Sequence, residues 1–209
     1  MEIGKFPFGA SVKFGWQKTK ENFWRLIAVT LIWIVIDVML SYFAKQFDKT
    51  TPFVFFIIQL GSHVVNMIMT LGITRIGLKL YAGEKFDVSE LFKSYRLFLK
   101  YFFASILYCL AVFAGLILLI VPGIILAIRM GLYTYLIVDK GMGPVDSLKE
   151  SIRLTKGNVF NLFLFWFVML GVLLLGILAL LVGIIVAVLV TMLAYIFVYR
   201  YLEIKKQAL

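Results

Sequence analysis

The chain has 209 residues, of which 63% are hydrophobic and 15% charged, and its mean hydropathy of +1.01 excludes an ordinary soluble domain. Its formal net charge is +10, yet the basic residues flank apolar runs, so we expect a bilayer with anionic headgroups as the partner and no nucleic acid. A single cysteine, Cys109, excludes an internal disulfide and a cysteine metal cluster.

The first two apolar runs predict a pair of transmembrane helices. Residues 23–44 are long enough to cross the hydrocarbon core once, and Asp37 is the charge in their apolar interior. A short polar turn leads to residues 53–81, which predict the second helix. Its interior contains the polar side chains of Gln59, His63, Asn66 and Thr70, among others. Because the turn is short, we expect the two helices to form a hairpin.

The middle of the chain predicts a second hairpin that follows a short helix. Asp87 and Glu90 resemble a capping box, and four apolar residues then occupy one helix face. These residues are Val88, Leu91, Phe92 and Tyr95. Residues 98–120 predict the third span, Val121-Pro122-Gly123 predicts a tight turn, and residues 124–138 predict a short fourth span.

A charged amphipathic helix is predicted before the last apolar run. Pro144 and Asp146 suit its first turn, and Gly157 suits its C-terminal cap. Its apolar face consists of Val145, Leu148 and Ile152. Its other residues include Arg153, Thr155 and Lys156. The helix is too short to span; an ordinary solvated connector is the alternative, but apolar runs on both sides favour a helix in the membrane interface.

The last apolar run is too long for one helix. Residues 159–199 are 41 consecutive positions without a charged side chain. One helix of that length would extend about 60 Å at about 1.5 Å per residue, roughly twice the hydrocarbon thickness. We therefore expect two spans, joined by a turn near residues 178–183.

An internal pattern relates three parts of the chain. Laying Ser11 on Ser147 aligns SVKFGWQKTKENFWRL with SLKESIRLTKGNVFNL, and the middle segment ELFKSYRLFLKYFF fits more loosely. This predicts one membrane domain, 1–209, with repeat-like units at about 8–82, 87–140 and 144–201. Similar membrane-entry signals are the alternative explanation. The predicted fold is all-α: a polytopic bundle of six transmembrane helices, arranged as three hairpins that each follow a short amphipathic interfacial helix.

The distribution of basic residues predicts the orientation. If every hairpin returns, both termini and all three short helices lie on one side, together with 18 of the 21 Lys and Arg residues. The opposite turns contain Lys45 and Lys49, and Arg129 lies inside a span. The excess predicts that the first side is cytoplasmic.

Three segments carry a resemblance to a known family. PGIILAIR, VDKG and SLKESIRLTKGN resemble a bacterial family of small integral membrane proteins of unknown function, related to the membrane domain fused to some glycerophosphodiester phosphodiesterases. The resemblance covers most of the chain and is strongest from Pro122 to Asn158. It implies a six-span bacterial membrane protein and no enzyme, since the phosphodiesterase barrel has no counterpart in this sequence.

The sequence predicts no catalytic residues, cofactor or metal site. It contains no Gly-rich phosphate loop, HExxH or GxSxG motif, and one histidine cannot form a multi-histidine metal site. His63 and Asn66 are three residues apart, so we expect both to face the same side. There, His63 forms a hydrogen bond within the bundle or, alternatively, handles protons.

Asp37 and Arg129 are the two charges inside predicted spans. Residue counting places both about 9 to 10 Å from the outer ends of their helices. Opposite charges at equal depth predict an ion pair with Gln59 as a third partner. The alternatives are an arginine that extends to the outer headgroups, with aspartate protonated or facing water, and a substrate or proton pathway. The predicted intramembrane polar cluster is Asp37, Gln59, His63, Asn66 and Arg129.

These observations favour a structural or partner-binding membrane component of the cell envelope. Its partner is expected to be a membrane protein or a second copy of the chain. The alternative is a small-solute or lipid transporter that uses the polar residues inside the bundle.

The hairpin topology predicts the labelling of two engineered cysteines. In a Cys109→Ser background, a cysteine at Lys49 should react with a membrane-impermeant thiol reagent in intact cells. A cysteine at Ser89 should react only after permeabilisation. Labelling of Ser89→Cys from outside the cell would overturn the topology.

Overall fold

The computed structural model describes residues 6–47 and 51–208, apart from the side chains of residues 181 and 182. Lys5 and Lys49, which entered the orientation count, lie outside the described residues. The described chain is helical, without a β-strand. Six helical segments are long and apolar enough to cross a membrane: Phe23–Lys45, Pro52–Tyr81, Glu90–Leu118, Ile120–Lys140, Val159–Leu178 and Gly183–Gln207. The expectation of an all-α chain with six candidate spans is confirmed.

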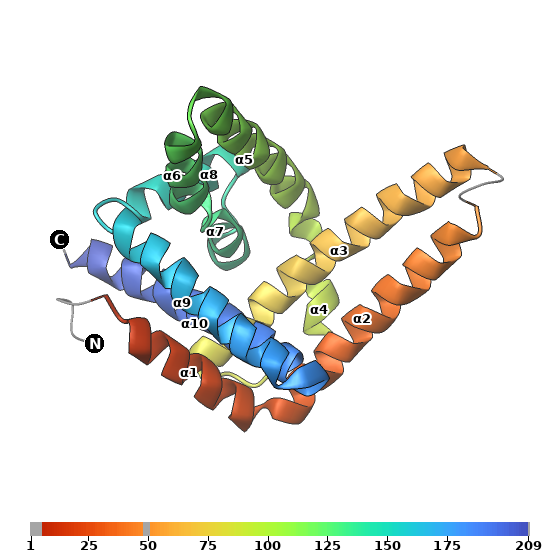
Figure 1. Ribbon diagram of the computed structural model, residues 1–209, viewed down its shortest axis with the longest axis horizontal. Helices are drawn as coiled ribbons and strands as arrows, with labels where there is room; N and C mark the ends of the chain where they lie inside the picture. The colour runs from red at the N-terminus through yellow and green to blue at the C-terminus, as the bar shows by residue number, and fades with distance from the viewer. Residues whose placement is uncertain (1–5, 48–50, 209) are drawn as a thin grey trace.

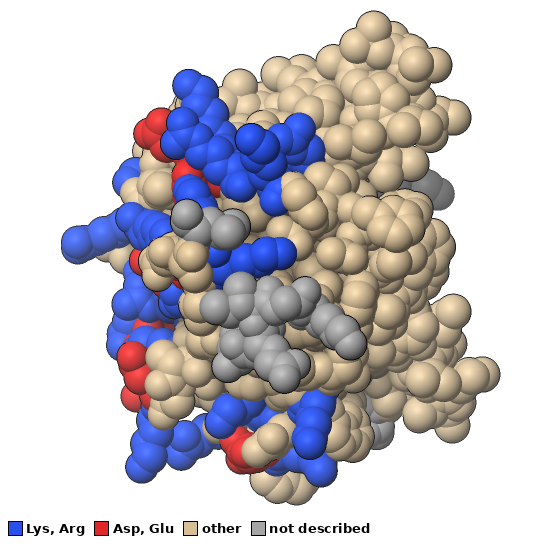
Figure 2. All heavy atoms as spheres, turned by 90° about the vertical axis from the view of Figure 1, so that its left-hand side faces the viewer, with Lys and Arg blue, Asp and Glu red and all other residues tan. Residues whose placement is uncertain are grey.

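The long helices form three arms that point in different directions (Figure 1). One arm contains α2 (Phe23–Lys45) and α3 (Pro52–Tyr81). A second contains α5 (Phe98–Leu118) and α6 (Ile120–Met130). The third contains α9 (Val159–Leu178) and α10 (Leu180–Gln207). Figure 2 shows that Lys and Arg gather along one side of the molecule.

Shorter elements lie between the arms. The chain begins with α1 (Phe8–Glu21), and α3 leads to α4 (Glu90–Lys93) and the 3₁₀ helix η1 (Tyr95–Leu97). The second arm continues into α7 (Tyr133–Lys140), which is followed by α8 (Pro144–Leu154). These elements pack against the long helices: α1 against α10, α4 against α3, and α8 against α5, α6 and α7.

Two predicted turns can be compared with the structure. The turn expected at Val121-Pro122-Gly123 lies earlier: α5 ends at Leu118, and α6 begins after the single extended residue Leu119. Pro122 therefore belongs to the first turn of α6, where its missing N–H leaves no hydrogen bond unmade. The turn expected near residues 178–183 is confirmed, because α9 ends at Leu178 and α10 begins at Leu180.

The helix predicted after Asp87 is short, since α4 covers only Glu90–Lys93 before η1 begins. Its predicted apolar face does not hold it in place, because Leu91 is buried but Val88, Phe92 and Tyr95 are exposed. Instead, the nearly buried carboxylate of Glu90 binds three cations and holds α4 against α3. The three cations are Arg75 at 3.0 Å, Lys79 at 3.0 Å and Lys93 at 2.7 Å.

Helix α10 is the centre of the structure, and α2 and α5 are its periphery. In the apolar 18-residue stretch of α10, 44% of the residues are buried, compared with 11% in the corresponding stretches of the spans that contain α2 and α5. Residues of α10 from Ala194 to Leu202 contribute to the largest buried cluster, together with residues from α7, α8 and α9. The outer faces of α2 and α5 are therefore available to lipid or to another protein.

The contact between α3 and α4 predicts the effect of one methyl group. A Cβ atom at Gly72 would lie 2.1 Å from the Leu91 carbonyl oxygen and 2.5 Å from Leu91 Cα. Gly72→Ala should therefore lower the free energy of unfolding by about 1 to 3 kcal/mol, measured by thermal unfolding in detergent.

Gly61→Ala is the matched control, since it adds the same methyl group to α3 at a site with nothing within 4 Å. Its effect should range from neutral to a stabilisation of about 1 kcal/mol. Equal stability of the two variants would contradict the close packing of α4 on α3.

Candidate functional site

The fourth span is broken in its middle, contrary to the prediction of one helix over residues 124–138. Helix α6 ends at Met130, Gly131 and Leu132 form a turn, and α7 begins at Tyr133. A break inside a membrane leaves backbone groups that must find other partners. Ser151 of α8 supplies them: its hydroxyl accepts from the Leu132 N–H at 3.1 Å and donates to the Arg129 carbonyl at 2.7 Å.

The face of α8 that contacts the break is small and polar. Ser147, Ser151 and Thr155 have no exposed surface, and the Thr155 hydroxyl lies 3.2 Å from the Arg129 carbonyl oxygen. Of the predicted apolar face, Leu148 is buried, Ile152 is half-buried and Val145 is 49% exposed. The face of α8 that packs on the protein is therefore the small polar one, and the predicted apolar face packs on it only in part. The reason is that the broken span presents backbone groups, which hydroxyls can bind and apolar side chains cannot.

The start of α8 follows the sequence prediction: Pro144 is its first residue and Asp146 lies in its first turn. The helix ends earlier than predicted, at Leu154 with Thr155 as its C-cap, and Gly157 lies two residues beyond that cap with a φ of +77°. Arg153 and Lys156 are exposed at this end of the helix.

Two members of the predicted intramembrane cluster meet. Asn66 of α3 donates to Asp37 Oδ1 of α2 at 2.8 Å, and its amide oxygen accepts from Trp33 Nε1 at 2.7 Å. These bonds join the two helices of the first arm, because an amide can donate and accept at the same time. Trp33 was not among the predicted site residues, because it lies in an apolar run in which its ring N–H gives no separate signal.

The other members of the cluster lie elsewhere. His63 is exposed, so it does not share the side of α3 on which Asn66 contacts α2. Gln59 is half-buried and forms no hydrogen bond with Asp37 or Arg129 among the described contacts. The Arg129 Nε atom is buried without a hydrogen-bond partner in the described part of the chain.

The ion pair predicted between Asp37 and Arg129 is not formed among the described residues. Asp37 is on α2, which packs against α3, whereas Arg129 is on α6, which packs against α5, α8 and α9. Equal depths of Asp37 and Arg129 lead to a contact only if their helices run parallel in one bundle. The arms diverge instead (Figure 1), and the fourth span is broken next to Arg129.

A second polar network lies where α7 meets α10. Arg200 donates to Asp139 at 2.7 Å and to Glu203 at 2.8 Å, and the Tyr199 hydroxyl donates to Asp139 at 2.8 Å. Lys140 completes the network by pairing with Glu203. Lys140 and Arg200 were counted only for the orientation, and nothing in the sequence spacing of the four charged residues indicated that they meet.

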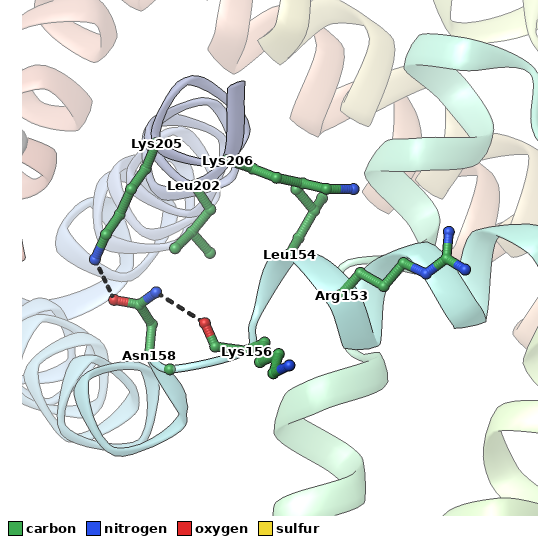
Figure 3. A pocket seen from close by; sticks show the side chains of 8 residues that line it. Arg153, Leu154, Lys156, Asn158, Leu202, Lys205 and Lys206 are labelled. Carbon is green, nitrogen blue, oxygen red and sulfur yellow. Dashed lines mark hydrogen bonds between the residues drawn. The ribbon is translucent and has the colours of Figure 1, made fainter. Parts of the chain in front are cut away.

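A basic pocket opens where α8 ends, α9 begins and α10 ends (Figure 3). Its volume is about 290 Å³, and its charged lining residues are Arg153, Lys156, Lys205 and Lys206. Lys205 Nζ donates to Asn158 Oδ1 at 3.0 Å, while Asn158 Nδ2 lies 3.3 Å from the Lys156 carbonyl oxygen. No acidic residue is among the described residues that line the pocket.

An apolar cavity of about 490 Å³ lies beside the broken span. It is lined by residues of α5, α6, α7, α9 and α10, and by the break itself at Gly131 and Leu132. Aromatic rings from Tyr108, Phe163 and Trp166 form part of its wall. A cavity of this size and lining suits an apolar ligand or a hydrocarbon chain.

Comparisons with known proteins add no assignment to this geometry. No family model, curated protein or solved structure matched the chain. The resemblance centred on Pro122 to Asn158 therefore stays a prediction.

The broken span predicts a large effect for one hydroxyl. Ser151→Ala would leave the Leu132 N–H without its partner, so the free energy of unfolding should fall by about 1 to 3 kcal/mol. Ser62→Ala is the control: Ser62 is also buried, but its hydroxyl bonds only within its own helix, to the Ile58 carbonyl. Thermal unfolding of both variants in the same detergent tests the difference. Equal losses would show that α8 does not satisfy the break.

Proposed function

We propose that the chain is a multi-pass protein of a bacterial plasma membrane with both termini in the cytoplasm. The gathering of Lys and Arg on one side supports this orientation (Figure 2), because basic residues accumulate on the cytoplasmic side of membrane proteins. Each pair of long helices then enters from the cytoplasmic side and returns to it, and the short helices lie at that surface.

We also propose that the three units are structural repeats. The residues aligned by sequence behave alike: Ser11 and Thr19 of α1 are buried, as are Ser147 and Thr155 of α8. The following asparagines, Asn22 and Asn158, have nearly the same dihedral angles, −119° and 22° against −123° and 13°. The packing is cyclic as well, since α4 and α8 each contact the second span of the preceding unit and α1 contacts the second span of the last unit.

The proposed role is that of a non-catalytic, partner-binding component of the envelope. The observation that carries it is the low burial of the outer arms. Only 11% of the residues are buried in the apolar 18-residue stretch of each span that contains α2 or α5, and these arms extend away from the centre. Met39 and Leu110, on α2 and α5, are 66% and 61% exposed. Such faces offer surface to a membrane-protein partner, a second copy of the chain, or lipid.

Lipid or small-solute transport is the second candidate. The apolar cavity beside the broken span favours it, because broken helices and cavities at their breaks recur in transporters. Asp37 and Arg129 lie on different arms, so the support for this candidate is the cavity and not a single polar cluster.

Purification and reconstitution separate the two roles. We expect a stoichiometric membrane-protein partner, or a second copy, to be retained in mild detergent, and proteoliposomes to show no flux of ions, small solutes or lipids. A photo-crosslinking residue at exposed Met39 should capture that partner, whereas the same residue at buried Val29 should not. Flux from a monomer without a partner would instead establish the transporter.

A further inference from the structure

The cationic side chains that line the basic pocket outnumber the carboxylates that pair with them. One carboxylate, that of Glu150, lies close by; it pairs with Lys206 and is 3.9 Å from Arg153. The Arg153 side chain is 73% exposed, and the Lys156 ammonium has no hydrogen bond or ion pair among the described contacts. Four cations with one carboxylate leave donors free for an anionic ligand, which distinguishes this pocket from the network at Asp139 and Glu203, where two carboxylates face Arg200 and Lys140.

The donors suit a phosphate group. Ammonium and guanidinium groups bind phosphate oxygens through charge-assisted hydrogen bonds. Asn158 is the N-cap residue of α9, and its side chain does not bind the first backbone N–H groups of that helix. The positive end of the helix dipole therefore adds to the positive charge of the lysines and the arginine. The volume of about 290 Å³ is close to the lower end of ligand pockets, which fits a headgroup better than a large solute.

The basic pocket and the apolar cavity share the same faces of two helices. On α9 the shared face carries Asn158 at the pocket and Leu162 and Trp166 at the cavity, so the cavity extends about 6 to 12 Å deeper at about 1.5 Å per residue. On α10, Leu202 lines the pocket and Tyr195 lines the cavity, seven residues or nearly two turns apart. The apolar cavity therefore lies deeper than the basic pocket along the same two helices.

Packed leucines separate the two spaces inside the protein. Leu154, Leu162 and Leu202 belong to one buried cluster. The path between the spaces therefore runs along the outer side of α9, where Trp166 is 53% exposed. That side faces the bilayer, so a membrane lipid can reach both spaces while remaining in its own leaflet.

We propose that this surface is a binding site for an anionic phospholipid of the cytoplasmic leaflet. Arg153 and Lys156 bind its phosphate, and an acyl chain runs along α9 past Phe163 and Trp166 into the apolar cavity. The assignment of the lipid to the cytoplasmic leaflet rests on the proposed orientation. The binding site itself does not, because the protein recognises the lipid by its headgroup charge and its acyl chain. A zwitterionic headgroup binds more weakly, since it carries a cation into an already cationic pocket.

Binding of dihexanoyl phosphatidylglycerol to the purified protein in non-ionic detergent tests the site, with the lipid-dependent rise in unfolding temperature as the readout. The double variant Arg153→Gln/Lys156→Gln should weaken binding by about tenfold or more, because each charge-assisted hydrogen bond contributes on that order. The control Lys13→Gln/Lys85→Gln removes two exposed, unpaired charges elsewhere and should change binding less than about twofold.

Two other ligands identify what is recognised. Dihexanoyl phosphatidylcholine should bind more weakly than phosphatidylglycerol, and inorganic phosphate alone should bind more weakly than either. Phosphate that binds as well as the lipid would reassign the pocket to a free anion and overturn the proposal. Equal losses in the pocket and control variants would reduce the effect to general surface charge, and absence of phosphatidylglycerol binding would also refute the site.

The chain path has its own measurement. Phosphatidylglycerol brominated on its acyl chains should quench the fluorescence of Trp166, and Trp166→Phe should remove that part of the quenching while headgroup binding persists. Unchanged quenching in the variant would place the chain elsewhere. Because these measurements use detergent, their failure is distinguishable from a reversed orientation, which only the cysteine-labelling experiment detects.

Discussion

The double hydrogen bond of Ser151 is the interaction on which the surrounding structure depends. Its hydroxyl replaces the backbone partners that Leu132 and Arg129 lose where the fourth span breaks. Nothing in a hydrocarbon environment could replace them as well, since lipid chains neither donate nor accept hydrogen bonds. The bond fixes α8 against the break, and α8 in turn places Arg153 and Lys156 at the rim of the basic pocket.

Charge is treated differently at two places on the basic side. Around Asp139 and Glu203, every carboxylate has a cation within hydrogen-bond distance, and the network joins α7 to α10. At the basic pocket, cations outnumber the carboxylates near them. The first arrangement is suited to holding helices together, and the second is suited to binding an anionic ligand.

The sequence predicted what depends on length and local chemistry, and missed what depends on distant contacts. The spans, the start of α8 and the turn before Leu180 follow from apolar run length, Pro144 and the limit on one helix. The break after Met130 did not follow from length or hydropathy, because Gly131 alone is a weak signal for a break and the stabilising partner, Ser151, lies on another helix. The basic pocket was missed for a related reason: its lysines and arginine come from segments about fifty residues apart.

The contact of α1 with α10 has a consequence for biosynthesis. Gly15 lies so close to Val190 that an added Cβ would be 2.5 Å from its carbonyl oxygen, and Phe6 packs against Tyr201 with ring centroids 5.9 Å apart. The ribosome makes α1 before any span, yet its docking surface emerges only with the final helix. The earliest segment is therefore among the last to reach its native place, and five spans must insert while it waits at the membrane surface.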